Sequence, residues 1–286
     1  MTVASYFLPR SLPEALALLE RHGPALLVMA GGTVVMPLVN DGISQPEAVM
    51  GLRLAGLDGL DGLEPGKTMV RIGAMATMTQ LLGQDAIPML AEAARNTASW
   101  AIRNMATVGG NLFTPPPGGD VAVALLALDA RVVLAGRNGE RVLPLADFYT
   151  GFLTNQLAAD ELLVALEVPA PAGSTAFIKF GRKHANTPAV VTVAVCLEWD
   201  GERVAGARIA LGAVGPHPIR ARGAERSLVG TRLAAGDIAA AAEAAGAECE
   251  PFTDAIATAW YRRRMTGLFV GRALEQAALG AGKAGR

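Results

Sequence analysis

The pattern of apolar and polar positions predicts a small α/β lobe at the start of the chain. Residues 11–14 (SLPE) have the spacing of a capping box, and the helix that follows them is expected to stop at Gly23-Pro24. The apolar run at residues 25–29 then predicts a strand. These elements together predict that residues 1–55 form one α/β unit.

The next stretch, residues 56–172, is expected to form a second lobe. Asn138-Gly139 separates two apolar runs, and this dipeptide is typical of a β-hairpin turn. Thr77 and Gln80 have the spacing of a helix start. The pattern predicts strands at residues 69–72, 131–135, 140–143 and 162–168, and a helix at about residues 89–98.

A proline-rich segment, residues 169–173 (PAPAG), is the best candidate for a linker because proline and glycine interrupt regular structure. We therefore predict one domain at residues 1–172 and a second at residues 173–286. In the second domain long strands precede helices, which is typical of an α+β fold. The predicted strands are 175–182, 190–199 and 204–214, a meander with a turn at Asp200-Gly201, and the predicted helices lie at about 221–229, 238–247 and 254–278.

The composition excludes several classes of protein. The 286 residues carry a formal net charge of −1, which provides no basic footprint for nucleic acid. Although 51% of the residues are hydrophobic, charged or turn residues interrupt every apolar run before the ~18–20 residues of a membrane helix. The first ten residues lack a secretory signal pattern. We expect a soluble cytoplasmic protein with no transmembrane segment and no nucleic-acid partner.

Metal and hydrolytic chemistry have little support in the sequence. Cys196 and Cys249 are the two cysteines, whereas an iron–sulfur cluster typically needs ~4, and the three histidines show neither HxxxH nor HxH spacing. Cys196 lies in an apolar run and is expected to be buried. Arg262-Arg263-Arg264 is expected to face solvent or another subunit. We predict no catalytic acid–base residue and no metal ligand.

Two glycine-rich turns are the most informative motifs of the chain. The first, residues 30–33 (AGGT), follows a predicted strand, and the second, residues 106–111 (ATVGGN), precedes a proline-rich loop. Glycine lacks a Cβ atom, so backbone N–H groups in such turns can approach phosphate oxygens closely. Two turns of this kind are suited to hold one diphosphate from two sides, which predicts a dinucleotide cofactor. No predicted strand is followed by the G-x-G-x-x-G fingerprint of nicotinamide dehydrogenases.

Asp120 has two interpretations. It follows the loop 115–119 (PPPGG) and precedes an apolar run, so it is placed to cap the start of a helix. Its carboxylate is equally placed to accept hydrogen bonds from hydroxyls of a ribose or ribityl chain. One carboxylate can serve both purposes, and the sequence leaves both open.

Seven segments, in order, resemble the FAD-binding medium subunits of molybdenum hydroxylases, the family of carbon monoxide dehydrogenase and xanthine dehydrogenase. The first three segments contain the two glycine turns and Asp120, and the other four cover most of the remaining chain. The segments are residues 30–40, 102–112, 120–134, 160–169, 176–183, 207–230 and 261–277.

The resemblance implies an α+β fold with two domains. The first is a two-lobed FAD-binding domain of the p-cresol methylhydroxylase and vanillyl-alcohol oxidase type, and the second is a carbon monoxide dehydrogenase flavoprotein-like domain with an antiparallel sheet and helices. From the residues alone, Leu163 would be a core strand residue and Lys179 a solvated charge. By resemblance both belong to the FAD site, which comprises Val28, Met29, Ala30, Gly31, Gly32, Thr33, Val34, Val35, Ala106, Thr107, Val108, Gly109, Gly110, Asn111, Thr114, Asp120, Leu163 and Lys179.

The resemblance also implies a function in electron transfer. FAD is expected to bind non-covalently, since neither glycine turn contains a histidine or cysteine. Substrate would be hydroxylated at a molybdopterin centre in a large partner subunit, and electrons would pass through [2Fe–2S] clusters of a small partner subunit to FAD and then to NAD⁺, a quinone or dioxygen. We expect a dimer of heterotrimers, with Trp260, Leu268, Phe269 and the arginine run 262–264 as candidate docking surface.

Two other functions stay open. A stand-alone flavin oxidase of the same FAD fold would need its own substrate pocket, and the region after Gly173 is short for a substrate-covering domain. A scaffold subunit with weakened FAD binding is the other alternative. It is motivated by Val34, where the family often has an acidic or polar residue, and by the loop 115–119, where relatives commonly have an alanine-rich segment.

Overall fold

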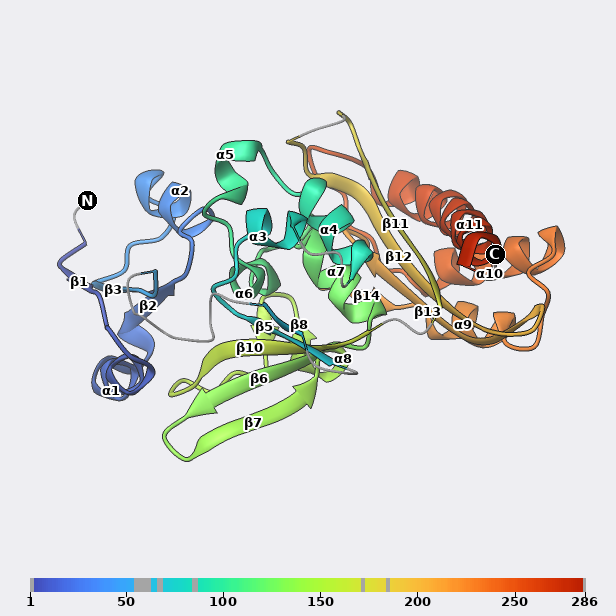
Figure 1. The fold of residues 1–286 in the computed structure, drawn as a ribbon. Coiled ribbons are helices and arrows are strands. Elements are labelled where there is room, and N and C mark those ends of the chain that lie inside the picture. The colour runs from blue at the N-terminus through green and yellow to red at the C-terminus, as the bar shows by residue number, and fades with distance from the viewer. Residues whose placement is uncertain are drawn as a thin grey trace.

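A computed structural model of the chain describes residues 3–53, 63–65, 69–83, 87–170, 173–183 and 186–284, and three larger sheets follow one another along the molecule (Figure 1). The predicted lobe boundary at residue 55 and the middle of the predicted linker, residues 171 and 172, lie outside the described residues. Among the helices that are described, none combines the length and apolar composition that a membrane span requires.

The first lobe is the predicted α/β unit. Its parallel strands β1 (Ser5–Phe7), β3 (Ala48–Gly51) and β2 (Leu26–Met29) lie in the order β1-β3-β2, with helices α1 (Leu12–His22) and α2 (Val35–Asn40) in the connections. The Ser11 side chain accepts a hydrogen bond from the Glu14 N–H and starts α1, and Gly23 ends it. A short 3₁₀ turn, η1 (Gly23–Ala25), delays the predicted strand by one residue.

The second sheet has five antiparallel strands in the order β4-β5-β10-β6-β7. The predicted hairpin is confirmed, because Gly136 pairs with Gly139 across a turn of Arg137 and Asn138. Gly139 adopts a φ of +106°, which glycine tolerates. The strands are β4 (Leu63–Pro65), β5 (Met69–Gly73), β6 (Arg131–Gly136), β7 (Gly139–Pro144) and β10 (Leu162–Pro169).

Short helices connect β5 to β6. The predicted helix start at Thr77 is confirmed as a capping box, in which Thr77 and Gln80 satisfy each other's backbone N–H groups. The helices are α3 (Met78–Leu82), α4 (Pro88–Arg95), α5 (Trp100–Arg103), α6 (Val108–Leu112) and α7 (Asp120–Ala127), whereas α8 (Leu145–Phe148) and the strands β8 (Tyr149–Gly151) and β9 (Thr154–Asn155) follow β7.

Helix α4 ends three residues earlier than predicted because its C-terminal end is tied down by a side chain. The Arg103 guanidinium donates through Nη1 to the carbonyl oxygens of Arg95, Thr97 and Ala98, each at 3.1 Å. Ala98 also has a φ of +49°, outside the helical range. Residues 95–98, which we call the strap, are thus held in a defined irregular shape.

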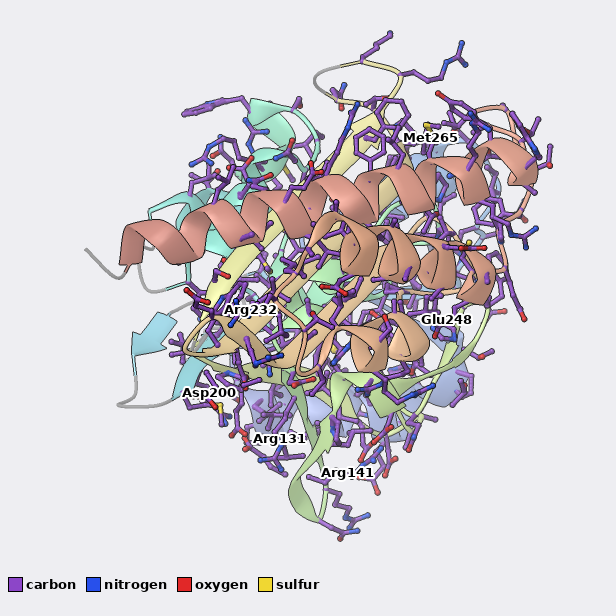
Figure 2. The ribbon with its side chains drawn as sticks, turned by 90° about the vertical axis from the view of Figure 1, so that its right-hand side faces the viewer. Arg131, Arg141, Asp200, Arg232, Glu248 and Met265 are labelled. Atoms are coloured by element: carbon purple, nitrogen blue, oxygen red, sulfur yellow. The ribbon has the colours of Figure 1, made fainter. Side chains whose placement is uncertain are left out.

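The C-terminal sheet is antiparallel, in the order β11-β12-β13-β14, and the predicted meander with its turn after Asp200 is confirmed. Its helices lie on the outer face, where Figure 2 shows α11 running across the sheet. Glu248, labelled in Figure 2, accepts hydrogen bonds from two N–H groups at the start of α9. The elements are β11 (Ser174–Gly181), β12 (Ala189–Asp200), β13 (Arg203–Gly212), β14 (Ile219–Arg220), α9 (Arg222–Leu228), α10 (Ala235–Glu248) and α11 (Ala259–Ala284).

Helix α7 lies between the second sheet and the C-terminal sheet and has no exposed face (Figure 1). All eight of its residues are buried, and they share one core with strands of both sheets. Gly212 on β13 permits the close approach, since a Cβ atom there would lie 2.4 Å from Val123 Cγ2. The two domains therefore meet through a continuous apolar core.

The last helix begins later than predicted. Residues 254–258 form a loop, because the Asp254 carboxylate accepts hydrogen bonds from the N–H groups of Ile256 and Ala257. Burial alone would raise the pKa of Asp254, but these hydrogen bonds and the Arg262 guanidinium lower it below its ordinary value. α11 then starts at Ala259.

Arg262 contradicts the expectation of a solvated arginine run. Its side chain is fully buried and forms two hydrogen bonds with Asp254, at 2.8 and 2.9 Å. Its Nη1 donates at 2.8–3.0 Å to three backbone carbonyls at the ends of β12 and β13, those of Ala189, Val190 and Ala213. The guanidinium fastens α11 to the sheet, so only the next two arginines of the run are exposed.

The candidate docking surface on α11 is also smaller than expected. Phe269 is buried in the core beneath the helix, where it stacks on Phe180 with ring centroids 4.5 Å apart. Trp260 and Leu268 remain exposed. Consecutive residues of a helix point about 100° apart, so Phe269 faces the core while Leu268 stays exposed.

We expect Arg262→Met to lower the free energy of unfolding by about 3–5 kcal/mol, because it leaves Asp254 without its cationic partner and removes the guanidinium donor from three carbonyls. Guanidinium unfolding followed by tryptophan fluorescence measures the change. Arg264→Met is the matched control: it is exposed, it contacts the Trp260 ring, and it should cost less than about 0.5 kcal/mol. Equal effects of the two substitutions would contradict the assignment of Arg262 as the fastening residue.

Candidate functional site

The fold brings the two glycine turns into direct contact, although about seventy residues of sequence separate them. The segment between β2 and α2 lies beside the segment that joins α5 to α6 (Figure 1). A Cβ atom on Gly31 would lie 1.8 Å from the Met105 carbonyl oxygen, and one on Gly110 would lie 3.7 Å from Ala30 Cβ. Glycine at position 31 is therefore what allows one backbone to touch the other.

The first turn has unused backbone donors. The N–H groups of Gly31, Gly32, Thr33 and Val34 donate to no acceptor within the described part of the chain. The turn is partly exposed, Gly32 has a φ of +72°, and α2 begins directly after Val34. Successive free N–H groups on a bare, partly exposed backbone form a concavity suited to an anion, so this turn fits a diphosphate.

The second turn differs from its prediction, because its glycine N–H groups are already bonded within the protein. Gly109 N–H donates to the Ala74 carbonyl oxygen at 2.8 Å, and Gly110 N–H donates to Thr107 Oγ1 at 3.1 Å as part of the α6 cap. A Cβ on Gly109 would lie 2.8 Å from Ala74. These glycines allow close packing of α6 on the end of β5, and they do not present free amides to a phosphate.

The remaining predicted residues of the second turn bond inward too. Asn111 Oδ1 accepts a hydrogen bond from the Ala122 N–H at 3.1 Å and so joins α6 to the start of α7. Thr114 Oγ1 donates to the Gly110 carbonyl oxygen at 3.3 Å. Thr107 is buried, and its hydroxyl accepts from Gly110 while keeping its own proton as a donor. The second turn thus holds the first in place.

Asp120 is not the cap of α7, which corrects one of its two interpretations. The N-cap is Gly119, whose φ of +84° is left-handed, and Asp120 is the first residue of the helix. Its carboxylate points to the C-terminal sheet, where Oδ2 accepts from Lys179 Nζ at 2.6 Å and Oδ1 accepts from Thr192 Oγ1 at 2.9 Å. Both oxygens therefore have a donor within the protein.

Lys179 is a buried charge and not a solvated one. Its side chain is 8% exposed, and its ammonium also donates to the Asn96 carbonyl oxygen in the strap, at 3.0 Å. Burial raises the pKa of Asp120 above its ordinary value, while the Lys179 ammonium and the Thr192 hydroxyl act in the opposite direction. The pair joins β11, α7 and the strap at one point.

Leu163 lies on β10 beside this assembly. It is buried in the shared core, opposite Leu134, and a bulge follows it before Ala165. The next residue, Val164, accepts a hydrogen bond from the Ala74 N–H, and Ala74 in turn accepts from Gly109. The residue after Leu163 is thus connected to the second turn through two backbone hydrogen bonds.

Three residues that support Asp120 and Lys179 were absent from the sequence prediction. Asn96 and Thr192 bond them directly, and Arg103 holds the strap that contains Asn96. Asn96 contributes only a backbone carbonyl, which no sequence pattern reveals. Thr192 did leave a signal, because it is a hydroxyl residue in the otherwise apolar run 189–197. A polar side chain inside a fully buried strand needs a partner.

The proline-rich loop borders a pocket at the C-terminal end of α6, which the predicted site residues Asn111 and Thr114 also line. Pro116 and Gly118 line it together with Tyr149, and His217 contributes from the C-terminal domain. The Tyr149 and His217 rings are stacked, with centroids 5.5 Å apart. No group of three His, Cys, Asp or Glu residues in the described ranges is arranged to hold a metal ion.

Two family models match nearly the whole chain. "FAD binding domain in molybdopterin dehydrogenase" matches residues 2–171, and "CO dehydrogenase flavoprotein C-terminal domain" matches residues 175–277. These matches and the glycine-turn site define the class of protein as an FAD-binding flavoprotein subunit.

Individual relatives narrow the class. The carbon monoxide dehydrogenase medium chain of Hydrogenophaga pseudoflava is 36% identical over 279 residues, which cover 95% of this chain and 96% of that one. A solved carbon monoxide dehydrogenase from the same organism, which lacks the Mo-pyranopterin moiety of the molybdenum cofactor, matches with a TM-score of 0.93 and 34% identity over 98% of this chain and 99% of that one. Quinoline 2-oxidoreductase from Pseudomonas putida 86 matches with a TM-score of 0.90 and 30% identity, over 98% of each chain. The chain belongs to the family of FAD-binding medium subunits of the molybdenum hydroxylases.

We expect Gly31→Ala to reduce FAD content by about tenfold or more, because the added Cβ would meet the Met105 carbonyl and push the two turns apart. Flavin absorbance relative to protein measures the content. Gly236→Ala is the control, since a Cβ there has no atom within 4 Å. Full flavin content in a folded Gly31→Ala protein would contradict the contact between the turns as a requirement of the site.

Proposed function

We propose that this chain is the electron-transfer subunit of a molybdenum hydroxylase complex, and that its FAD diphosphate binds at the first glycine turn. The observation that carries the proposal is the run of four backbone N–H groups, Gly31 to Val34, without an acceptor in the described residues. They are partly exposed and adjacent, and the second turn supports them from behind. When bound, FAD supplies the redox chemistry of the subunit.

The residues of this chain contribute position and electrostatics to the proposed site. Val28 and Met29 lead into the first turn, and Val34 and Val35 lead out of it. Residues 106–111 with Thr114 fix the second turn against the first. Asp120, Lys179 and Leu163 form the adjoining wall, in which the charges are paired with each other. We assign no catalytic acid or base, because electron transfer through FAD requires none from the protein.

The proposed partners are a small subunit with [2Fe–2S] clusters and a large molybdopterin subunit, assembled as a dimer of heterotrimers. The two cysteines of this chain are both buried and unpaired, and one cluster needs ~4 cysteine ligands. An iron–sulfur donor to FAD therefore has to lie in another chain. The external acceptor is NAD⁺, a quinone or dioxygen, and the large subunit determines the hydroxylated substrate.

We also propose the division of the chain into residues 1–172 and 173–286, with lobes at about 1–55 and 56–172, and a cytoplasmic location. The end of β10 at Pro169 and the start of β11 at Ser174 support the division. The two free thiols support a reducing compartment.

The purified full-length chain should bind an equimolar amount of FAD non-covalently. Acid precipitation should release the flavin into the supernatant, where its absorbance and chromatographic mobility identify it as FAD. The reason is that the first turn offers only backbone hydrogen bonds and contains no histidine or cysteine. Flavin that stays in the precipitate would exclude non-covalent binding. Failure to take up FAD under any reconstitution condition would favour the scaffold alternative.

The isolated chain should not oxidise the physiological substrate, but it should restore acceptor reduction when mixed with its two partner subunits. Copurification from the native source, followed by iron and molybdenum analysis, measures the assembly. Trp260→Ala and Leu268→Ala test the exposed part of the α11 surface. Substrate-dependent turnover by the pure single chain would favour a stand-alone flavin oxidase.

A further inference from the structure

Strand β12 places one hydroxyl where the rest of its buried surface is apolar. Alternate residues of β12 face opposite sides: Val191, Val193 and Val195 pack under the outer helices, whereas Ala194 and Cys196 belong to the core around α7. Thr192 shares this second face, and it is 1% exposed. A buried hydroxyl is costly unless it is hydrogen-bonded, and the Thr192 hydroxyl bonds to Asp120.

The register of the C-terminal sheet aligns the donors that hold Asp120. Lys179 on β11 is the direct cross-strand partner of Thr192, and Gly212 on β13 is its partner on the other side. Lys179 and Thr192 therefore point to the same face, and each bonds one oxygen of the Asp120 carboxylate. Gly212 leaves room for α7 to come this close.

The two donors differ in their other contacts. Lys179 also bonds the Asn96 carbonyl of the strap, so its ammonium is shared between α7 and the strap. Thr192 has Asp120 as its acceptor and no other described partner. Removing the Thr192 hydroxyl would leave Oδ1 without its donor in a buried place, where a carboxylate with an unmet oxygen is unfavourable.

We propose that Thr192 is a positioning residue for FAD binding: its hydroxyl holds the Asp120 carboxylate so that Lys179 stays shared between Asp120 and the strap. The inference rests on the proposed FAD site, because Asp120 and Lys179 act on FAD only if they line it. Thr192 itself need not touch the cofactor. It acts through Asp120, and its contribution depends on the charge of that carboxylate.

The charge environment of Asp120 is simple enough for a pH test. Lys179 is the charged group that contacts it from β11, while Arg208 of β13 and Arg220 of β14 bond carbonyls at the opposite end of α7. On α4, Glu92 and Arg95 pair with each other. Replacing Thr192 by valine removes a donor that favours the ionised form, so the pKa of Asp120 should rise further. Protonated Asp120 would then release Lys179 at a higher pH than in the wild-type chain.

The experiment compares the FAD dissociation constants of the wild-type chain, Thr192→Val and Thr192→Ser between pH 5 and 8. Bound FAD is removed first, and FAD is then added back while its fluorescence is followed. Thr192→Val should weaken binding by about tenfold at pH 8 and by more at acidic pH. The pH at which half the FAD is released should move up by about one unit. Thr192→Ser keeps the hydroxyl and should retain the wild-type profile.

A double-mutant cycle with Asp120→Asn tests whether Thr192 acts through the Asp120 charge or only through packing. In an Asp120→Asn background the carboxylate charge is absent, so Thr192→Val should change FAD affinity by about twofold or less and without pH dependence. If Thr192→Val does not fold, Thr192→Ala replaces it in the same cycle. An unchanged pH profile in the wild-type background, or an equal loss in both backgrounds, would overturn the role of Thr192. A wild-type chain that takes up no FAD would instead overturn the proposed FAD site.

Discussion

Burial of α7 is the constraint on which the structure depends. A helix with no exposed face has only its two ends at which polar groups can be satisfied, and both ends have partners in the C-terminal sheet. Lys179 and Thr192 bond the carboxylate at the first residue, while Arg208 and Arg220 donate to carbonyls in the last turn. Negative charge at the start and positive charge at the end also match the helix dipole. The C-terminal sheet thus completes a helix that belongs by sequence to the other domain.

This constraint explains how three distant segments contribute to one proposed site. The first glycine turn comes from the first lobe, the second turn from the short helices before α7, and Lys179, the proposed wall residue, from the C-terminal sheet. α7 connects the last two, because Asn111 bonds its first turn and Asp120 bonds the sheet. A change in how the C-terminal sheet packs on α7 is therefore transmitted to the proposed cofactor site. The two domains are separate in sequence, but residues of both pack in one apolar core.

Local patterns in the sequence were enough to predict the elements whose partners are close along the chain. The capping box at Thr77, the Asn-Gly hairpin and the meander all depend on residues a few positions apart, and each is present. At the start of α1 only half of the predicted box forms, because Ser11 caps the helix while the Glu14 carboxylate accepts from the Arg10 N–H. The errors involve long-range partners. Gly109 was expected to offer its amide to phosphate, but Ala74 accepts it. Arg262 was expected in solvent, but carbonyls about fifty and seventy residues away bind it. Its burial and the late start of α11 follow from Asp254, whose role depends on the finished fold.

The contact of Gly31 with the Met105 carbonyl has a consequence for how this subunit can be altered. Main-chain atoms make both sides of that contact, and main-chain amides make the adjacent site proposed for the diphosphate. Such a site is indifferent to the chemistry of most surrounding side chains, as long as glycine occupies the crossing point. The side chains of exposed neighbours such as Met36 and Met105 therefore take no part in this main-chain contact. Protein engineering can vary these two side chains while the main-chain contact between the two turns stays the same.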